Sequence, residues 1–330
     1  MKRRHHSFPL KPSTHSFIQE ARKTSGYSFF DWLHGYIYGR WPYLYISIGT
    51  GEHRFAPFLA KLWQIFTKIF QPKPGNNGSG ERITFADTYH GKVMPLEQAS
   101  RLVTINKDIS LKDLEQIIPY AKARDIILRN PDHIVALECP CRAARPHPCE
   151  PLDVCLIVGE PFAGFIKEHH PHRSRWITQK EAVDILEAEH ERGHVHHAFL
   201  KDAMLGRFYA ICNCCKCCCG AMQAWRNGTP MLASSGYVSQ IDEELCVLCE
   251  ACADACQFGA IHMGDDMIIL DDKLCMGCGV CVSKCETGAL SLLRDPGKGE
   301  PLEIQELIAS ADKECHLVNS LLENKEIRSQ

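Results

Sequence analysis

Apolar residues at helical spacing predict a helix over residues 178–193. The stretch opens with Thr178-Gln-Lys-Glu181, a capping box in which threonine and glutamate each bond a free backbone N–H group. Gly193 is a typical end, because glycine readily adopts the left-handed conformation that follows a last helical turn. The residues between them recur at three- and four-residue steps: Ala182, Val183, Ile185, Leu186 and Glu189.

Two more helices and a short strand are predicted upstream. Ser110-Leu-Lys-Asp113 is a second helix start, and its helix would run to about Arg129. The apolar residues of this stretch fall roughly on one face: Leu114, Ile117, Ile118, Ala121 and Ile126. Pro95 suits the first turn of a shorter helix, and residues 133–137 form a short strand that leads to Cys139. These elements predict a small α/β platform that supports cysteine-rich loops.

The first 80 residues are basic and rich in aromatic side chains. They hold eleven Lys or Arg and three Asp or Glu, a local charge of +8. The stretch from Phe55 to Phe70 is amphipathic, and a linker rich in glycine and proline follows over residues 72–80. Such a helix usually packs on protein, and its basic and aromatic character makes the inner face of a membrane the alternative.

Eight cysteines form two identical runs with the spacing C-x2-C-x2-C-x3-C. The runs are Cys246, Cys249, Cys252, Cys256 and Cys275, Cys278, Cys281, Cys285. They belong to an internal repeat, in which residues 238–261 align with residues 267–290 at an offset of 29. Each copy is predicted to contain a strand, a cysteine-rich loop, a short helical turn and a second strand, with a turn at residues 264–266 between the copies. This spacing is typical of two [4Fe–4S] clusters, whereas zinc sites usually separate two C-x2-C pairs by a spacer.

Residues 236–295 closely resemble the bacterial two-cluster ferredoxins. In that family the fourth cysteine of each run binds the other cluster. The resemblance therefore implies two ligand sets: Cys246, Cys249, Cys252 and Cys285 for one cluster, and Cys275, Cys278, Cys281 and Cys256 for the other. The chain departs from the family where a proline usually follows the fourth cysteine, because Gln257 and Glu286 stand there. Neither residue is a ligand, so the departure concerns the local backbone and the cluster potentials.

Ten further cysteines lie between residues 139 and 219. They are Cys139, Cys141, Cys149, Cys155, Cys212, Cys214, Cys215, Cys217, Cys218 and Cys219. Ordinary buried cysteines occur singly, so this density predicts at least one further metal centre. Ten thiols suffice for one or two additional Fe–S clusters; a zinc or copper thiolate site and a set of redox-sensing free thiols are the alternatives. Arg142 and Lys216 are candidates to offset the negative charge of thiolates.

Six histidines form two groups near these cysteines: His169, His170, His172 and His194, His196, His197. Metal ligation is the less favoured interpretation, because histidine often titrates on a surface without a ligand role. His196 and His197 precede the cysteine run by about fifteen residues, which makes a substrate or proton path conceivable.

The order of motifs is itself informative. A C-P-C-R unit, a helix, the run I-C-N-C-C-K-C-C-C and a ferredoxin module follow one another over residues 131–295. This order resembles a group of uncharacterised prokaryotic 4Fe–4S dicluster proteins. The resemblance implies a redox function and names no substrate.

Composition and charge exclude several classes of function. The net charge of −3 argues against general nucleic-acid binding. The sequence has no run of 18 apolar residues, and its twin arginine near Met1 is followed by a polar stretch, so neither a transmembrane helix nor a signal peptide is expected. Thiolates that bind Fe–S clusters must stay reduced, which favours the cytoplasm. No dinucleotide fingerprint or P-loop supports nicotinamide, flavin or nucleotide binding.

The sequence thus predicts an α+β protein in which a two-cluster ferredoxin module follows a small helical α/β cysteine-rich domain. The expected divisions are a basic N-terminal region at 1–80, the cysteine-rich domain at 81–235, the ferredoxin domain at 236–295 and a solvated helical tail at 296–330. The predicted function is iron–sulfur electron transfer with redox partner proteins. The alternatives are an Fe–S oxidoreductase with a catalytic centre in residues 139–219, and a thiol or metal redox sensor. Cys315 is isolated and is expected to be structural.

Overall fold

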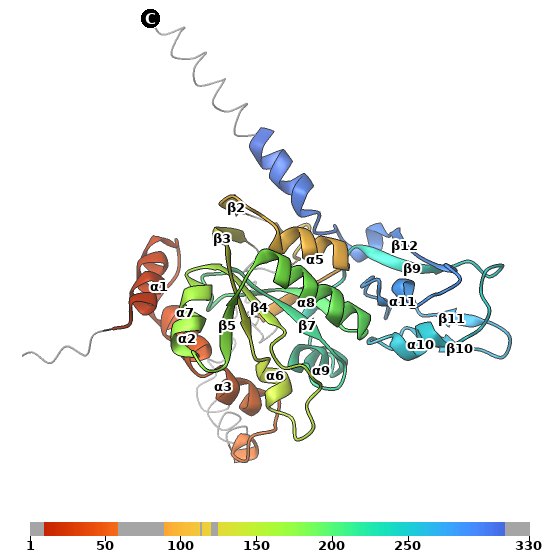
Figure 1. Cartoon of the computed structure of the whole chain (residues 1–330), viewed down its shortest axis with the longest axis horizontal. Coiled ribbons are helices and arrows are strands. Elements are labelled where there is room, and N and C mark those ends of the chain that lie inside the picture. The colour runs from red at the N-terminus through yellow and green to blue at the C-terminus, as the bar shows by residue number, and fades with distance from the viewer. Residues whose placement is uncertain (1–9, 59–88, 113, 120–124, 314–330) are drawn as a thin grey trace, which may run out of the picture.

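The computed structural model describes residues 10–58, 89–112, 114–119 and 125–313, and its centre is an eight-stranded sheet (Figure 1). The strand order is β2-β3-β4-β7-β6-β1-β8, and β5 pairs with β3 outside this path. The strands are β1 (Tyr89–Met94), β2 (Ile109–Leu111), β3 (Ile126–Leu137), β4 (Cys155–Glu160), β5 (Ser174–Ile177), β6 (Val195–Lys201), β7 (Arg207–Cys214) and β8 (Leu232–Ala233). These strands pair antiparallel, except that β1 and β8 are parallel.

Helices cover both faces of the sheet. One face packs against α5 (Leu96–Val103) and α8 (Gln179–Glu191), and the other against α1 (Pro12–Lys23), α2 (Phe29–Arg40) and α7 (Phe162–His169). Successive side chains of a strand point to opposite faces. Thus Ile134 and Ala136 of β3 join the core under α5 and α8, whereas Val135 and Leu137 join the core under α7. The central strands are therefore buried on both faces.

The ferredoxin module lies beside the sheet (right-hand side of Figure 1). It contains β9 (Tyr237–Ile241), α10 (Ala251–Ala255), β10 (Ile261–Met263), β11 (Ile268–Leu270), α11 (Val280–Ser283) and β12 (Leu290–Arg294). The strands form two antiparallel pairs, β9 with β12 and β10 with β11. The two cysteine loops share their backbone conformation: Leu248 and Glu250 have φ of 55° and 65°, and the equivalent Gly277 and Gly279 have 63° and 80°. The repeat in the sequence is thus a repeat in the backbone.

The mixed α/β architecture agrees with the prediction, as do several of its elements. Thr178 caps α8 and accepts a hydrogen bond from the Glu181 amide, Pro95 precedes α5, and residues 133–137 lie in β3. The helix predicted from Ser110 to about Arg129 is wrong. Its start belongs to β2 and its end to β3, which pair with each other across the intervening residues.

Two further predicted helices lie toward the two ends of the chain. The helix expected over Phe55–Phe70 lies largely outside the described residues, so membrane contact through it stays a prediction. Residues 304–313 are helical, but Leu302 and Ile304 are buried in the core under α5 and α8, so this part of the tail is not simply solvated. Within the described residues, no helix has the length and apolar character needed to cross a membrane.

Gly277 is expected to be essential to the second cysteine loop. A Cβ atom there would lie 2.2 Å from the Tyr237 carbonyl oxygen and 2.3 Å from Ser235 Oγ, whereas a Cβ at Gly288 would meet no atom within 4 Å. Both glycines have positive φ, which alone costs an L-residue about 1–2 kcal/mol. We expect Gly277→Ala to lower the unfolding midpoint in denaturant clearly more than Gly288→Ala. Equal losses would show that the close approach does not matter.

Candidate metal centres

The eight cysteines of the ferredoxin module lie around two cavities of about 20 Å³ each. Cys246, Cys249, Cys252 and Cys285 line the first, and Cys256, Cys275, Cys278 and Cys281 line the second. In each cavity, three cysteines come from one loop and the fourth from the other copy of the repeat. These are the same sets of four that the ferredoxin resemblance assigns to each cluster.

Backbone amides beside these sulfur atoms suit bound thiolates. The amides of Ser239 and Ala260 donate to the sulfur atoms of Cys275 and Cys256 at 3.4 and 3.2 Å. Such N–H···S contacts stabilise bound clusters and tune their potentials. A hydrogen bond with Thr287 lowers the pKa of Cys285, whereas burial raises the pKa of Cys281 to about 11. The residues present therefore fit iron–sulfur clusters.

The two cavities differ in their exposure. Cys249 is exposed, and the adjacent Val247 side chain is 65% exposed, so the first cavity lies near the surface. Cys275 and Cys281, in the second cavity, are buried. Cys256 and Cys278 also pack against the core that contains cysteines of the sheet. The second cavity therefore faces the rest of the chain.

Strand geometry divides the other ten cysteines into two groups. Cys212 and Cys214 are two residues apart on β7, so their side chains share a face of the sheet, and Cys155 on β4 pairs directly with Cys212. Cys215 follows the end of β7 and leaves this face. We call the first set the buried thiol group, and it comprises Cys139, Cys141, Cys155, Cys212, Cys214 and Cys219.

The thiols of the buried group form a continuous series of side-chain contacts. Cys155 contacts both Cys212 and Cys139; Cys141 contacts both Cys139 and Cys219. Cys219 Sγ lies 3.2 Å from Cys214 Sγ, which completes the series. All six line one cavity of about 60 Å³. The neighbouring Cys141 thiol and burial raise the pKa of Cys139 to about 12, so thiolates here need a positive partner such as a metal.

The remaining four cysteines form a second, more compact set, which we call the tetrathiolate group. Cys149, Cys215, Cys217 and Cys218 have sulfur atoms that all lie within 4.8 Å of one another. Cys149 comes from the loop between α6 (Pro140–Ala143) and β4, and the other three come from the turn between β7 and α9 (Gly220–Arg226). The sequence separates Cys149 from this turn by more than 60 residues, and the fold brings them together.

A buried ion pair joins α6, which carries Cys141, to α8. Arg142, which follows Cys141, donates to Glu189 of α8 at 2.5 Å, and the two side chains are 1% and 0% exposed. Arg142 also donates to the carbonyl oxygens of Pro151 and Asn213, at 2.5 and 3.0 Å. Burial alone would raise the pKa of Glu189, but His194 and Arg142 hold it below its usual value. Arg142, expected to offset thiolate charge, is thus already paired with a carboxylate.

Gln257 provides a direct link between the ferredoxin module and the cysteine-rich turn. Its side-chain oxygen accepts a hydrogen bond of 2.8 Å from the Lys216 amide, between Cys215 and Cys217. Nearby, the ring of Phe258 lies 5.3 Å from that of Trp225 in an edge-to-face contact. A proline at position 257 would lack this acceptor. The departure from the ferredoxin pattern therefore coincides with an internal interface.

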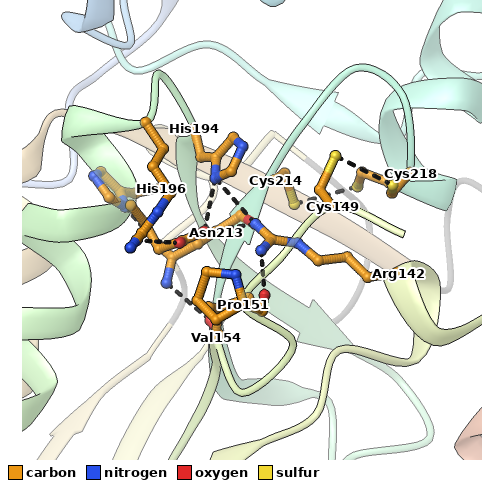
Figure 2. A network of polar contacts seen from close by, with 12 residues as sticks. Arg142, Cys149, Pro151, Val154, His194, His196, Asn213, Cys214 and Cys218 are labelled. Atoms are coloured by element: carbon orange, nitrogen blue, oxygen red, sulfur yellow. Dashed lines mark hydrogen bonds and ion pairs between the residues drawn. The ribbon is translucent and has the colours of Figure 1, made fainter. Parts of the chain in front are cut away.

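Four of the six histidines make hydrogen bonds within the fold. His169 and His170 contact Thr14 Oγ1 and the Gly39 carbonyl oxygen, at 3.0 and 2.8 Å. His196 contacts Asn213 Oδ1 at 2.6 Å, and Asn213 donates to the Val154 carbonyl oxygen (Figure 2). Among the described residues, no histidine joins the tetrathiolate group.

One feature was not anticipated from the sequence. A cavity of about 280 Å³ next to the buried thiol group is lined by Cys141, Lys201 and three tyrosines, Tyr38, Tyr45 and Tyr89. The Lys201 ammonium lies 5.0 to 5.7 Å from the three ring centres, within the range of cation–π attraction. Burial lowers the pKa of Lys201 to about 8. The sequence signal for this cavity was Lys201, the one lysine of the fully buried strand β6.

Comparison with known proteins supports the ferredoxin module. The family model of the 4Fe-4S binding domain matches residues 239–262 and residues 268–291, one match for each copy of the repeat. No curated protein matches the chain. Residues 239–291 are therefore a ferredoxin-type 4Fe–4S module, and the many other cysteines agree with an iron–sulfur electron-transfer protein.

Loss of the Glu189 charge should destabilise the cysteine-rich region. Glu189→Gln keeps the shape of the side chain but leaves the buried Arg142 without its counter-charge, which typically costs about 3–5 kcal/mol. We expect a correspondingly lower unfolding midpoint in denaturant. Glu187→Gln, on the exposed side of the same helix, is the control and should change stability by less than about 0.5 kcal/mol. Equal effects of the two substitutions would contradict a stabilising role of the ion pair.

Proposed function

We propose that this chain transfers electrons through two [4Fe–4S] clusters in the ferredoxin module and a further iron–sulfur centre in the buried thiol group. The observation that carries the proposal is the arrangement of the module's cysteines, four around each of two cavities. When bound, such clusters accept and release single electrons. The ligands of the first cluster are Cys246, Cys249, Cys252 and Cys285, and those of the second are Cys256, Cys275, Cys278 and Cys281.

A redox partner protein docks at the first cavity. The loop around Cys249 exposes Leu245, Val247 and Leu248, and it carries the exposed acids Glu243, Glu244, Glu250 and Asp254. Apolar side chains surrounded by acids fit a partner with an apolar contact area and a basic rim. The exposure of Cys249 shortens the distance to a docked partner.

The second cavity is on the path to the cysteine-rich region. Cys256 and Cys278 share a core with Cys139, Cys155, Cys214 and Cys219 of the buried thiol group. The contact between Phe258 and Trp225 bridges the same boundary, because Trp225 belongs to α9, which begins directly after Cys219. Electrons therefore pass from the partner to the surface cavity, then to the buried cavity and on to the buried thiol group.

Iron and acid-labile sulfide per chain, measured on protein purified without oxygen, test this proposal. Two cubanes account for about eight of each, so we expect about twelve or more in the intact chain. Cys249→Ala should remove one cluster, seen as loss of its electron paramagnetic resonance signal, and leave the centre of the buried thiol group. Cys212→Ser should instead remove the centre of the buried thiol group and leave both clusters of the ferredoxin module. Eight or fewer iron atoms in the intact protein would contradict an iron–sulfur centre in the buried thiol group.

An oxidoreductase is the second candidate function, and the cavity at Lys201 favours it. The cavity adjoins Cys141, and a lysine beside tyrosine rings suits a small substrate with an anionic group. This function requires a centre with an open coordination position. Cyanide added to the reduced protein should then shift the resonance signal that Cys212→Ser removes, whereas an unchanged signal favours electron transfer alone.

A further inference from the structure

The tetrathiolate group is more compact than any other set of potential ligands in the described part of the chain. Its four sulfur atoms lie within 4.8 Å of one another, with contacts of 3.0 Å between Cys149 and Cys217 and 3.7 Å from Cys218 to each of them. No three cysteines of the ferredoxin module come this close together. The two kinds of cysteine sites therefore differ in size.

The spacing indicates how many metal ions the group can hold. Four thiolates about 2.3 Å from one tetrahedral zinc ion lie about 3.8 Å from each other. A cubane binds each thiolate through a different iron atom, which places the sulfur atoms farther apart. All four sulfur atoms lie within 4.8 Å of one another, which matches a single ion and is too compact for a cubane. The buried thiol group also has a short contact, 3.2 Å between Cys214 and Cys219, but no three of its sulfur atoms come this close together.

From this geometry we infer that Cys149, Cys215, Cys217 and Cys218 bind one zinc ion. Four sulfur ligands leave no open position, which is the pattern of structural zinc sites rather than catalytic ones. Redox-inert zinc stabilises a fold without taking part in electron transfer. The inference goes beyond the proposed function, because it gives four of the ten cysteines a role outside the electron path.

The charges near the group suit such a site. Four thiolates and one zinc ion carry a net charge of −2, which nearby cations stabilise. The Arg145 guanidinium donates to the Cys218 carbonyl oxygen from two of its nitrogen atoms, at 3.3 and 3.2 Å. Arg226 donates to the carbonyl oxygen of Lys216, which lies between Cys215 and Cys217 in the sequence. Two guanidinium groups thus lie against the loops that carry the ligands, and that of Arg145 also pairs with Glu52.

The position of the group explains what the ion would stabilise. It joins the loop of Cys149 to the turn after β7, two segments that are distant in the sequence. Cys215 and Cys218 also line the cavity of the buried thiol group, and Lys216 between them bonds to Gln257 of the ferredoxin module. Zinc here holds one wall of that cavity against the module.

Zinc and iron content of the full chain, purified without oxygen, tests the inference. We expect one zinc per chain in the unmodified protein, and less than a tenth of that in Cys217→Ser and in Cys149→Ser. Both variants should retain the iron of the ferredoxin module. The matched control is Cys212→Ser, in the buried thiol group, which should lose iron and retain zinc. Cobalt added to chelator-treated protein should give the visible absorption of a tetrahedral thiolate site, except in Cys217→Ser.

Three results would overturn the zinc site. The first is intact protein without zinc, including protein with a lone iron atom in its place. The second is zinc that persists in both cysteine variants. The third is a loss of a whole iron–sulfur cluster in Cys217→Ser, which would make the group a cluster ligand set and leave the proposed electron transfer intact. Because two separate cysteines are replaced, misfolding of one variant still leaves the other as a test.

Discussion

The buried ion pair between Arg142 and Glu189 determines where the cysteine loops lie. A guanidinium without solvent access needs a carboxylate and several acceptors. Arg142 obtains them from α8, from the loop before β4 and from the end of β7. The loop before β4 carries Cys149, and the end of β7 carries Cys212 and Cys214. One charge thus sets the relative positions of three segments that are far apart in the sequence, and both cysteine groups depend on that arrangement.

The sheet accounts for the division of the cysteines. The pairing of β4 with β7 places Cys155 beside Cys212, and alternation along β7 adds Cys214 to the same face. The turn that follows has no such restriction, so Cys215, Cys217 and Cys218 are free to meet Cys149. A strand and a turn in direct succession therefore yield a large buried set and a small compact set from a single run of cysteines.

The parts of the structure that depend on local sequence were predictable. The cysteine spacing and the 29-residue repeat led to the ferredoxin module, which the family match supports, and the capping box at Thr178 gave the start of α8. The helix predicted after Ser110 was wrong, although Leu114, Ile117 and Ile118 have helical spacing. The strands β2 and β3 form there instead, because they are stabilised by pairing with their neighbours in the sheet. β3 also contains Pro131 within a register shift between Arg129 and Ile134, which hides its strand pattern. The contacts of Cys149 with Cys215, Cys217 and Cys218 could not be predicted either, because they depend on strand pairing between segments that are far apart in the sequence.

The contacts of Gln257 with Lys216 and of Lys284 with Glu191 attach the ferredoxin module to the rest of the chain. A free ferredoxin must diffuse to its acceptor, so its reaction is second order and slows as salt screens the attraction. In the electron path proposed above, the donor and the acceptor belong to one chain, so fixed geometry would replace concentration. Transfer along this proposed path would be a first-order process that dilution and ionic strength leave unchanged. Dilution and salt would then affect only the encounter with the proposed external partner.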